Sequence, residues 1–242
     1  MDDMAAALAR EREAIGPLLS LTDPGDALTA YYALYHPAAL TRLYVQRGAS
    51  GRAEGFVATC TTGADLFRPL VVLRAERDRL LGDLLRGGLA AGRPYRFSAP
   101  LRYAALLEGL LRLTETRVAL VLLLDVTVFE PVLNVLVVPA QGADGGLRFE
   151  IRSREGRVLA ASGTNWRSPH FAEVYVYSEP EVRGRGFARS VASACTAALL
   201  EEGVRPLYVA SEGDEASLGL AAGLGYRDSG HREWIAAGVR EA

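Results

Sequence analysis

The spacing of hydrophobic positions divides the first half of the chain into helices and strands. Apolar residues at helical spacing, ended by glycine or proline, predict helices at residues 4–19, 23–36, 75–85 and 101–113. Short apolar runs between glycine-containing turns predict strands at residues 43–46, 55–60 and 69–73, and a longer apolar run predicts a strand at 118–128. These elements predict a mixed α+β N-terminal half.

The second half of the chain alternates more regularly. Strands are predicted at residues 135–138, 147–153, 158–162 and 173–178. A glycine loop, a helix, a strand, a second helix and a last strand follow, over residues 180–186, 187–202, 207–210, 214–224 and 233–236. No short-period repeat is found.

These elements predict an α/β fold class of mixed α+β type with two domains. Residues 1–130 form a smaller α+β domain, and residues 131–242 form a domain with a central mixed β-sheet flanked by helices. The boundary falls between about Val126 and Gly146, where no obvious linker marks it.

Composition supports a globular protein without a membrane segment. The chain has 242 residues, of which 50% are hydrophobic and 23% charged, so it has enough apolar side chains for a core. Its longest strongly apolar run, residues 118–124, falls far short of the roughly 20 residues of a membrane helix. Asp2 and Asp3 stand where a signal peptide has basic residues, so we expect a cytoplasmic protein.

Residue usage excludes several kinds of site. All 27 basic side chains are arginine, which excludes a Walker-type lysine and a Schiff-base lysine. Cys60 and Cys195 form no CxxC pair, and three histidines offer no familiar ligand spacing, so we expect no metal. The net charge of −2 gives no reason to bind nucleic acid. A small-molecule partner or a modest protein site fits better.

One segment, Arg183–Ala188, carries a recognisable chemistry. It connects an apolar strand to an amphipathic helix, and its sequence is Arg-Gly-Arg-Gly-Phe-Ala. Glycines at such a junction let the backbone turn tightly and direct N–H groups outward, where the start of a helix already favours an anion. Arg183 and Arg185 add positive charge to the same group of amides. A pyrophosphate is the natural ligand of this arrangement.

This segment has two other possible interpretations. Its glycines can simply form a surface turn, but the hexamer [Arg/Gln]-x-x-Gly-x-[Gly/Ala] occurs once in the chain and at the strand-to-helix position that the chemistry requires. A dinucleotide-binding fingerprint is excluded, because the three-glycine spacing and the early βαβ placement are both missing.

Residues 147–236 resemble the GNAT superfamily of acyl-CoA-dependent N-acyltransferases, whose pyrophosphate loop has this form. The strand at residues 206–210, the helix that follows and the ending Leu224-Gly225-Tyr226 come in the same order. The resemblance, which extends to bacterial two-domain members, implies a GNAT-type fold and acetyl-CoA as co-substrate. The residues that it places against the cofactor are Tyr177, Ser178, Arg183, Gly184, Arg185, Gly186, Phe187, Ala188, Asp214 and Ser217. Asp214 is equally well explained as a helix N-cap.

The chain departs from the superfamily pattern at Ala221, because many members have at this position a tyrosine that protonates the departing thiolate. Strand alternation puts Glu173, Tyr175 and Tyr177 on one face, where they would supply a base and a replacement acid. The alternative is a rim carboxylate with two packing tyrosines. His170 is a second candidate base.

Three other side chains are candidates for the site or the core. Cys195 lies on the apolar face of the helix after the glycine loop and is expected in the core. Trp166 and Tyr208 either line a pocket or belong to the core.

These observations favour an N-acetyltransferase that moves an acetyl or short acyl group from acyl-CoA to an amine of a small molecule or peptide. Residues 1–130 would then form the acceptor-side wall. The alternative is a catalytically silent acyl-CoA-binding or regulatory module. A nucleotide-binding domain is disfavoured by the absence of lysine. The sequence predicts no oligomeric state.

Overall fold

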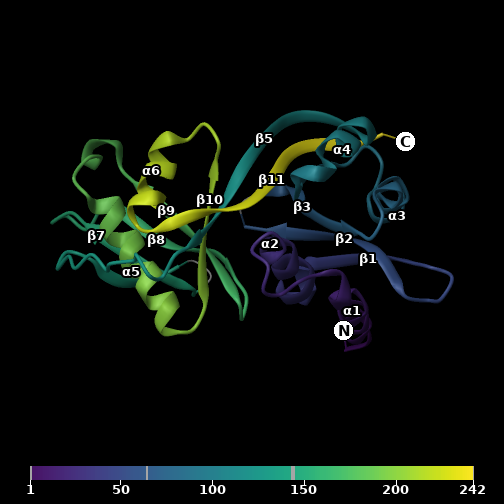
Figure 1. Cartoon of the computed structure of the whole chain (residues 1–242), viewed down its shortest axis with the longest axis horizontal. Coiled ribbons are helices and arrows are strands. Elements are labelled where there is room, and N and C mark those ends of the chain that lie inside the picture. The colour runs from purple at the N-terminus through teal and green to yellow at the C-terminus, as the bar shows by residue number, and fades with distance from the viewer. Residues whose placement is uncertain (1, 64, 143–144, 242) are drawn as a thin grey trace. The chain divides into compact units, whose positions relative to one another are not determined.

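The computed structural model describes residues 2–63, 65–142 and 145–241, and it divides into two compact units (Figure 1). Unit 1 consists of Met1–Ala119 and Arg232–Ala242, and unit 2 of Leu120–His231. The last strand therefore contributes to the first unit. These bounds differ from those of the expected domains, 1–130 and 131–242, and the domain division stays a prediction.

Unit 1 opens with helices and continues as a sheet. Its helices are α1 (Asp2–Ile15), α2 (Ala27–Ala30), α3 (Leu81–Gly88) and α4 (Ala104–Leu110), with a π-helical turn at Tyr31–Tyr35 and 3-10 turns at Gly16–Leu18, Ala38–Leu40, Asp78–Leu80 (η4) and Leu101–Tyr103 (η5). Its strands are β1 (Thr41–Arg47), β2 (Ala53–Thr62), β3 (Asp65–Ala75) and β4 (Pro94–Pro100). Strands β1, β2 and β3 are antiparallel, and α3 connects β3 to the parallel strand β4.

Unit 2 carries the second set of strands. Its elements are β6 (Val138–Gln141), β7 (Leu147–Arg152), β8 (Val158–Arg167), β9 (Phe171–Ser178), η6 (Pro180–Val182), α5 (Phe187–Glu201), β10 (Arg205–Ser211) and α6 (Glu215–Gly223). Strands β6 to β9 are antiparallel, and α5 connects β9 to the parallel strand β10. Two long strands, β5 (Leu111–Leu124) and β11 (Tyr226–Arg240), each contribute one segment to unit 1 and one to unit 2.

The two units share one order of elements. Three antiparallel strands, a crossover helix, a parallel strand and a further helix occur as β1-β2-β3-α3-β4-α4 in unit 1 and as β7-β8-β9-α5-β10-α6 in unit 2. No short-period pattern in the sequence reveals this repeat, because it is a repeat of topology and its two loops and helices differ in sequence.

Each unit has its own apolar core. In unit 1, leucines of α3 pack with Val71 and Leu73 of β3, Phe97 of β4 and Trp234 of β11. In unit 2, α5 packs on β7, β8, β9 and β10, and its buried Cys195 and Leu199 share a cluster with Val174 of β9. The helix face predicted to be apolar is therefore the face that α5 buries.

Several predicted elements have different bounds in the structure. The helix predicted from residue 75 begins at Leu81, because Ala75 still pairs with Gly55 in the sheet. The helix predicted over 101–113 ends at Leu110, where β5 begins. The strand predicted at 135–138 lies at Val138–Gln141, and that predicted at 233–236 extends over Tyr226–Arg240.

Strand β4 was not predicted, because Pro94 and Pro100 at its ends read as breakers. Among the described residues, no helix is long and apolar enough to span a membrane.

Candidate functional site

A cleft opens in unit 2 where strands β9 and β10 part. The two strands pair at Phe171↔Arg205, Ala172↔Pro206 and Glu173↔Leu207. Beyond this pairing lies a cavity of about 620 Å³, which is within the usual size range of ligand sites. Its lining includes Val176, Tyr177, Ser178, Pro180, Val182, Arg183, Gly184, Gly186, Phe187, Ala188, Tyr208, Asp214, Ala216, Ser217 and Leu220.

The residues expected against the cofactor therefore gather around one cleft, with a single exception. Arg185 is the expected cofactor residue that is absent from this lining. Strand β9, the glycine loop and the start of α6 each contribute side chains or backbone, so elements far apart in the sequence converge here. Binding of the cofactor by these residues stays a prediction.

The glycine loop has a backbone that only glycine adopts easily. Gly184 and Gly186 both have φ of +76°, in the left-handed region, and Gly186 is the N-cap residue of α5. An added Cβ at either glycine would meet no atom within 4 Å, so the requirement for glycine is conformational and the space beside the loop is open. This conformation ends the loop at the first turn of a 15-residue helix.

The amides of this loop divide into two groups. Those of Arg183 and Arg185 donate within the turn, to the carbonyl oxygens of Pro180 and Val182 at 3.3 Å in both cases. The amides of the first turn of α5, in contrast, have no carbonyl one turn earlier in the helix to accept from them. These first-turn amides and the positive end of the helix dipole are what the loop presents to an anion.

The start of α6 forms the opposite side of the cleft. The Oδ1 atom of Asp214 accepts a 3.0 Å hydrogen bond from the backbone N of Ser217, so the N-cap interpretation is confirmed. The Ser217 hydroxyl lies 2.9 Å from the Tyr208 hydroxyl of β10. Tyr208 is 5% exposed, and its burial raises the pKa of the phenol above its usual value.

The Tyr208–Ser217 hydroxyl pair was not predicted from the sequence, where Tyr208 was only a possible lining or core aromatic. Strand alternation places the Tyr208 side chain on the side of β10 that packs against α6. The alternation along the strand was visible in the sequence, but the partner, Ser217, was not predictable because it lies on the next helix.

The three expected catalytic residues are not gathered together in the cleft. Of these three, Tyr177 lines the cavity; it is 46% exposed, and a hydrogen bond with Glu179 raises the pKa of its phenol. The Tyr175 oxygen accepts a 2.6 Å hydrogen bond from Arg148, which leaves its own proton available for donation. Tyr175 and Glu173 are absent from the cavity lining.

Glu173 is held by two donors from β8. Its carboxylate accepts hydrogen bonds from Asn165 Nδ2 at 2.7 Å and from Trp166 Nε1 at 2.5 Å. Trp166 therefore orients a carboxylate, and it does not line the cleft. Such a fixed carboxylate suits a relay through water, and a catalytic role for Glu173 stays a prediction.

The remaining candidates take structural positions or stay unassigned. Ala221 and Cys195 are fully buried in the core of unit 2, and burial raises the pKa of the Cys195 thiol to about 12, so it is a poor nucleophile. His170 donates its backbone N–H to Ser168 Oγ, and its role as a base stays a prediction. Within the described residues, no His, Cys, Asp and Glu cluster is suited to a metal ion.

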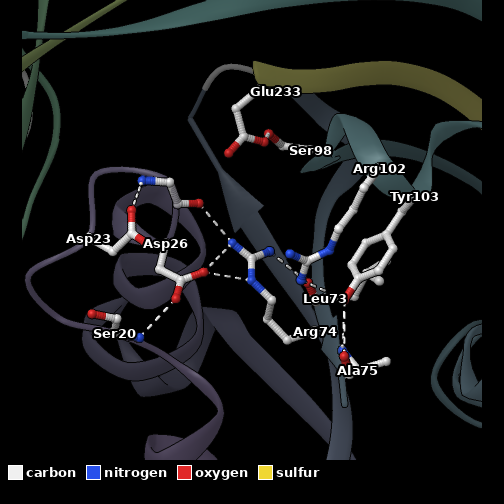
Figure 2. A network of polar contacts seen from close by, with 11 residues as sticks. Ser20, Asp23, Asp26, Leu73, Arg74, Ala75, Ser98, Arg102, Tyr103 and Glu233 are labelled. Carbon is white, nitrogen blue, oxygen red and sulfur yellow. Dashed lines mark hydrogen bonds and ion pairs between the residues drawn. The ribbon is translucent and has the colours of Figure 1, made fainter. Parts of the chain in front are cut away.

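The corresponding region of unit 1 is closed. Strand β3 pairs with β4 at Val71↔Phe97. In η5, the Tyr103 hydroxyl accepts a hydrogen bond from the Ala75 backbone N at 3.3 Å and donates one to the Ala75 carbonyl oxygen at 3.1 Å. Figure 2 shows this contact beside the buried Arg74, whose guanidinium bonds Asp26. The connection before α3, residues 76–80, contains no glycine and folds as the 3-10 turn η4.

Comparison with known proteins agrees with the geometry of unit 2. The sequence profile of the family described as FR47-like protein matches residues 154–235, which span β8 to β11 and include the whole cleft. No curated protein sequence matches the chain.

Solved structures resemble most or nearly all of the chain. A GCN5-related N-acetyltransferase-like protein from Streptococcus suis has a TM-score of 0.59 at 17% identity, with coverage of 96% of this chain and 99% of its own. A tandem GNAT protein from the clavulanic acid biosynthesis pathway has a TM-score of 0.62 at 13% identity, covering 98% and 95%. A GNAT-family protein from Novosphingobium aromaticivorans has a TM-score of 0.54 at 20% identity, covering 73% and 86%.

These findings show that the chain has the GNAT acetyltransferase fold, and they confirm the expected mixed α/β class. The tandem arrangement of one neighbour agrees with the repeated order of elements in units 1 and 2.

Proposed function

We propose that this chain is an acyl-CoA-dependent N-acyltransferase whose cofactor cleft lies between β9 and β10. The observation that carries the proposal is the pair of left-handed glycines, Gly184 and Gly186, at the start of α5 and on the wall of a 620 Å³ cavity. The donor would be acetyl-CoA or a short acyl-CoA, and the acceptor an amine of a small molecule or peptide. We further propose a bacterial, cytoplasmic enzyme that uses no metal, nucleic acid or membrane.

The residues present fit the pyrophosphate of CoA. The first-turn amides of α5 and the helix dipole would hold its oxygens, and the guanidinium groups of Arg183 and Arg185 would add charge at the same loop. Ser178 and Tyr177 at the end of β9, with Ser217 at the start of α6, would flank the pantetheine. The acyl-CoA supplies the thioester that the amine attacks directly.

The protons of this reaction need a donor and an acceptor. The amine must lose a proton to attack, and the thiolate gains one unless it leaves as the anion. Tyr177 and Tyr208 are phenols that line the cleft, and Tyr175 keeps a free O–H proton. We assign the donor to one of these three tyrosines, and the relay of the amine proton to Glu173.

The alternative function is a catalytically silent acyl-CoA-binding or regulatory module. The observation that favours it is the buried Ala221 at the position of the superfamily's tyrosine. The two functions differ in turnover: a binder shows saturable acetyl-CoA affinity without release of thiol, whereas an enzyme releases free CoA when an amine is supplied.

The substitution Gly186→Val tests the cofactor site. A β-branched side chain at φ of +76° strains the loop, and it occupies the space into which the pyrophosphate would fit. Acetyl-CoA affinity measured by calorimetry is expected to fall by at least about tenfold, the equivalent of one charge-assisted hydrogen bond. A panel of amines with free-thiol detection then tests turnover in the wild-type protein.

The matched control is Gly156→Val. Gly156 has φ of +85° with equally open space, but it lies in the β7–β8 turn, outside the cavity lining. The Gly156→Val substitution should lower the free energy of unfolding by a similar amount and leave the acetyl-CoA affinity unchanged. Unchanged acetyl-CoA affinity in folded Gly186→Val protein contradicts the proposed site.

A further inference from the structure

Unit 1 contains a second cavity, of about 300 Å³, at one end of the sheet face that α3 covers. Residues of four strands form its floor, among them Arg42, Thr59, Thr61 and Tyr95. In the registers of β1–β2 and β2–β3, Arg42 lies opposite Thr59 and Thr59 opposite Val71. The same face is apolar further along, at Val57, Leu73 and Phe97, so its polarity changes at the cavity.

The cavity carries two positive charges. Arg42 lies on the floor and Arg93 on the rim, and no carboxylate is among the described residues that line it. Neither guanidinium has a hydrogen bond or an ion pair with any part of the chain that the structure describes, and that of Arg93 lies 5.6 Å from the Tyr95 ring centroid. Arg47, Arg77 and Arg86 of the same unit, in contrast, each pair with a carboxylate.

Uncharged donors accompany the two arginines. The Tyr95 oxygen accepts a 3.1 Å hydrogen bond from the Ala90 backbone N, so its O–H proton is available to another acceptor. Thr59 and Thr61 add two hydroxyl groups. The set of donors therefore exceeds the acceptors that the side chains of this cavity offer, which is the chemistry of an oxyanion site.

The wall opposite the floor is fixed backbone. A Cβ at Gly87 would lie 2.1 Å from Tyr44 Cζ, and one at Gly88 would lie 2.9 Å from Val57 Cβ. The end of α3 therefore packs directly on the sheet at these two glycines, and bulkier residues would separate them. A cavity with one rigid wall keeps its shape without a ligand, which lowers the ordering cost of binding.

We propose that this cavity binds the carboxylate or phosphate group of a small molecule through Arg42 and Arg93. The planar guanidinium matches both kinds of oxyanion, and a volume near 300 Å³ suits a small ligand. The cavity shares no lining residue with the cleft of unit 2, so the proposal is independent of the proposed acyl transfer.

The test is calorimetric titration of the full chain with inorganic phosphate and, separately, with succinate. Saturable binding of at least one of the two is expected, and the tighter one identifies the preferred oxyanion. Arg42→Gln and Arg93→Gln should each weaken that binding at least about tenfold, since each removes a charge-assisted hydrogen bond. Both arginines are exposed and without ion pairs, so both variants should fold.

Two controls separate this site from other positive charges. Arg79→Gln changes an exposed arginine of η4 in the same unit and should bind as the wild type does. Gly186→Val damages the proposed cofactor loop and should leave this binding intact, so the two proposals fail independently. The inference is overturned if neither anion binds, or if the double variant of Arg42 and Arg93 binds as tightly as the wild-type protein.

Discussion

At the scale of single residues, Ala221 offers no phenol at the position where many GNAT members have a tyrosine, but the cleft of unit 2 has two other phenols in its lining, Tyr177 and Tyr208. Tyr208 reaches the cavity from strand β10 and Ser217 from helix α6, and their hydroxyl groups lie 2.9 Å apart. Burial raises the pKa of Tyr208, and a hydrogen bond with Glu179 raises that of Tyr177. Both groups therefore stay protonated well above neutral pH, which is the form that donates to a thiolate.

We expect Tyr208→Phe to lower turnover by about 100-fold with a confirmed acceptor, the lower range for a general acid. Tyr177→Phe should have the smaller effect, because this half-exposed phenol can be replaced by water. Because both pKa values are raised above about 10, wild-type turnover should show no loss from phenol ionisation up to about pH 9. Steady-state rates from free-thiol release across this range measure both effects.

Tyr226→Phe is the matched control for this experiment. Tyr226 is also a buried phenol with one hydroxyl partner, Thr196 at 2.8 Å, but it does not line the cleft. Loss of the Tyr226 hydroxyl should lower the free energy of unfolding and leave turnover unaltered. If Tyr208→Phe and Tyr177→Phe both keep wild-type turnover, the phenols only pack in the cleft, and the thiolate leaves without their assistance.

At the scale of elements, α5 and α6 show two ways of starting a helix beside the same cleft. Helix α5 begins at a left-handed glycine without a side-chain cap, and its first-turn amides stay open to a ligand. Helix α6 is capped by Asp214, whose carboxylate already accepts a hydrogen bond from the backbone N–H of Ser217. A bound anion is therefore expected at α5 and not at α6.

The cap of α6 can be separated from ligand contact by two substitutions. Asp214→Ala removes the hydrogen bond to Ser217 and should lower the free energy of unfolding by about 1 kcal/mol. Asp214→Asn keeps a capping oxygen and should retain stability, while it removes a negative charge near an anionic ligand. Denaturant unfolding and acetyl-CoA calorimetry distinguish the two effects.

The outcome for Asp214→Asn decides the role of the charge. Affinity equal to or tighter than that of the wild type is expected, because the amide still caps and no longer repels phosphate. A large loss of affinity would show that the carboxylate itself binds the ligand.

Local patterns predicted the elements around the cleft, and non-local contacts account for what was missed. The loop at Arg183–Ala188 and helix α5 follow from nearby residues, because left-handed glycines and an apolar helix face act within one turn. The pairing of Tyr208 with Ser217 and the contact of Tyr103 with Ala75 depend on how distant segments meet. Strand β4 was missed because pairing with β11 overrides the prolines at its ends.

At the scale of the whole molecule, the repeated order of elements raises the question of how many acyl-CoA molecules one chain binds. Unit 2 has open space where its parallel strands part, and a glycine loop before its crossover helix. In unit 1 the Tyr103 hydroxyl ties the end of β3 to the segment after β4, as Figure 2 shows. The turn before α3 carries Glu76 and Asp78 together with Arg77 and Arg79, so it has no net positive charge to attract a pyrophosphate.

We therefore expect one acetyl-CoA per chain, bound by unit 2. The two loops differ at several positions, since the turn before α3 has no glycine, whereas the loop before α5 has two left-handed glycines. Calorimetry should give a stoichiometry of one acetyl-CoA for the wild type. Gly186→Val should remove this single binding event, and no second binding event should remain. A wild-type stoichiometry of two, with one binding event of unchanged affinity left in Gly186→Val, would place a cofactor site in unit 1 as well.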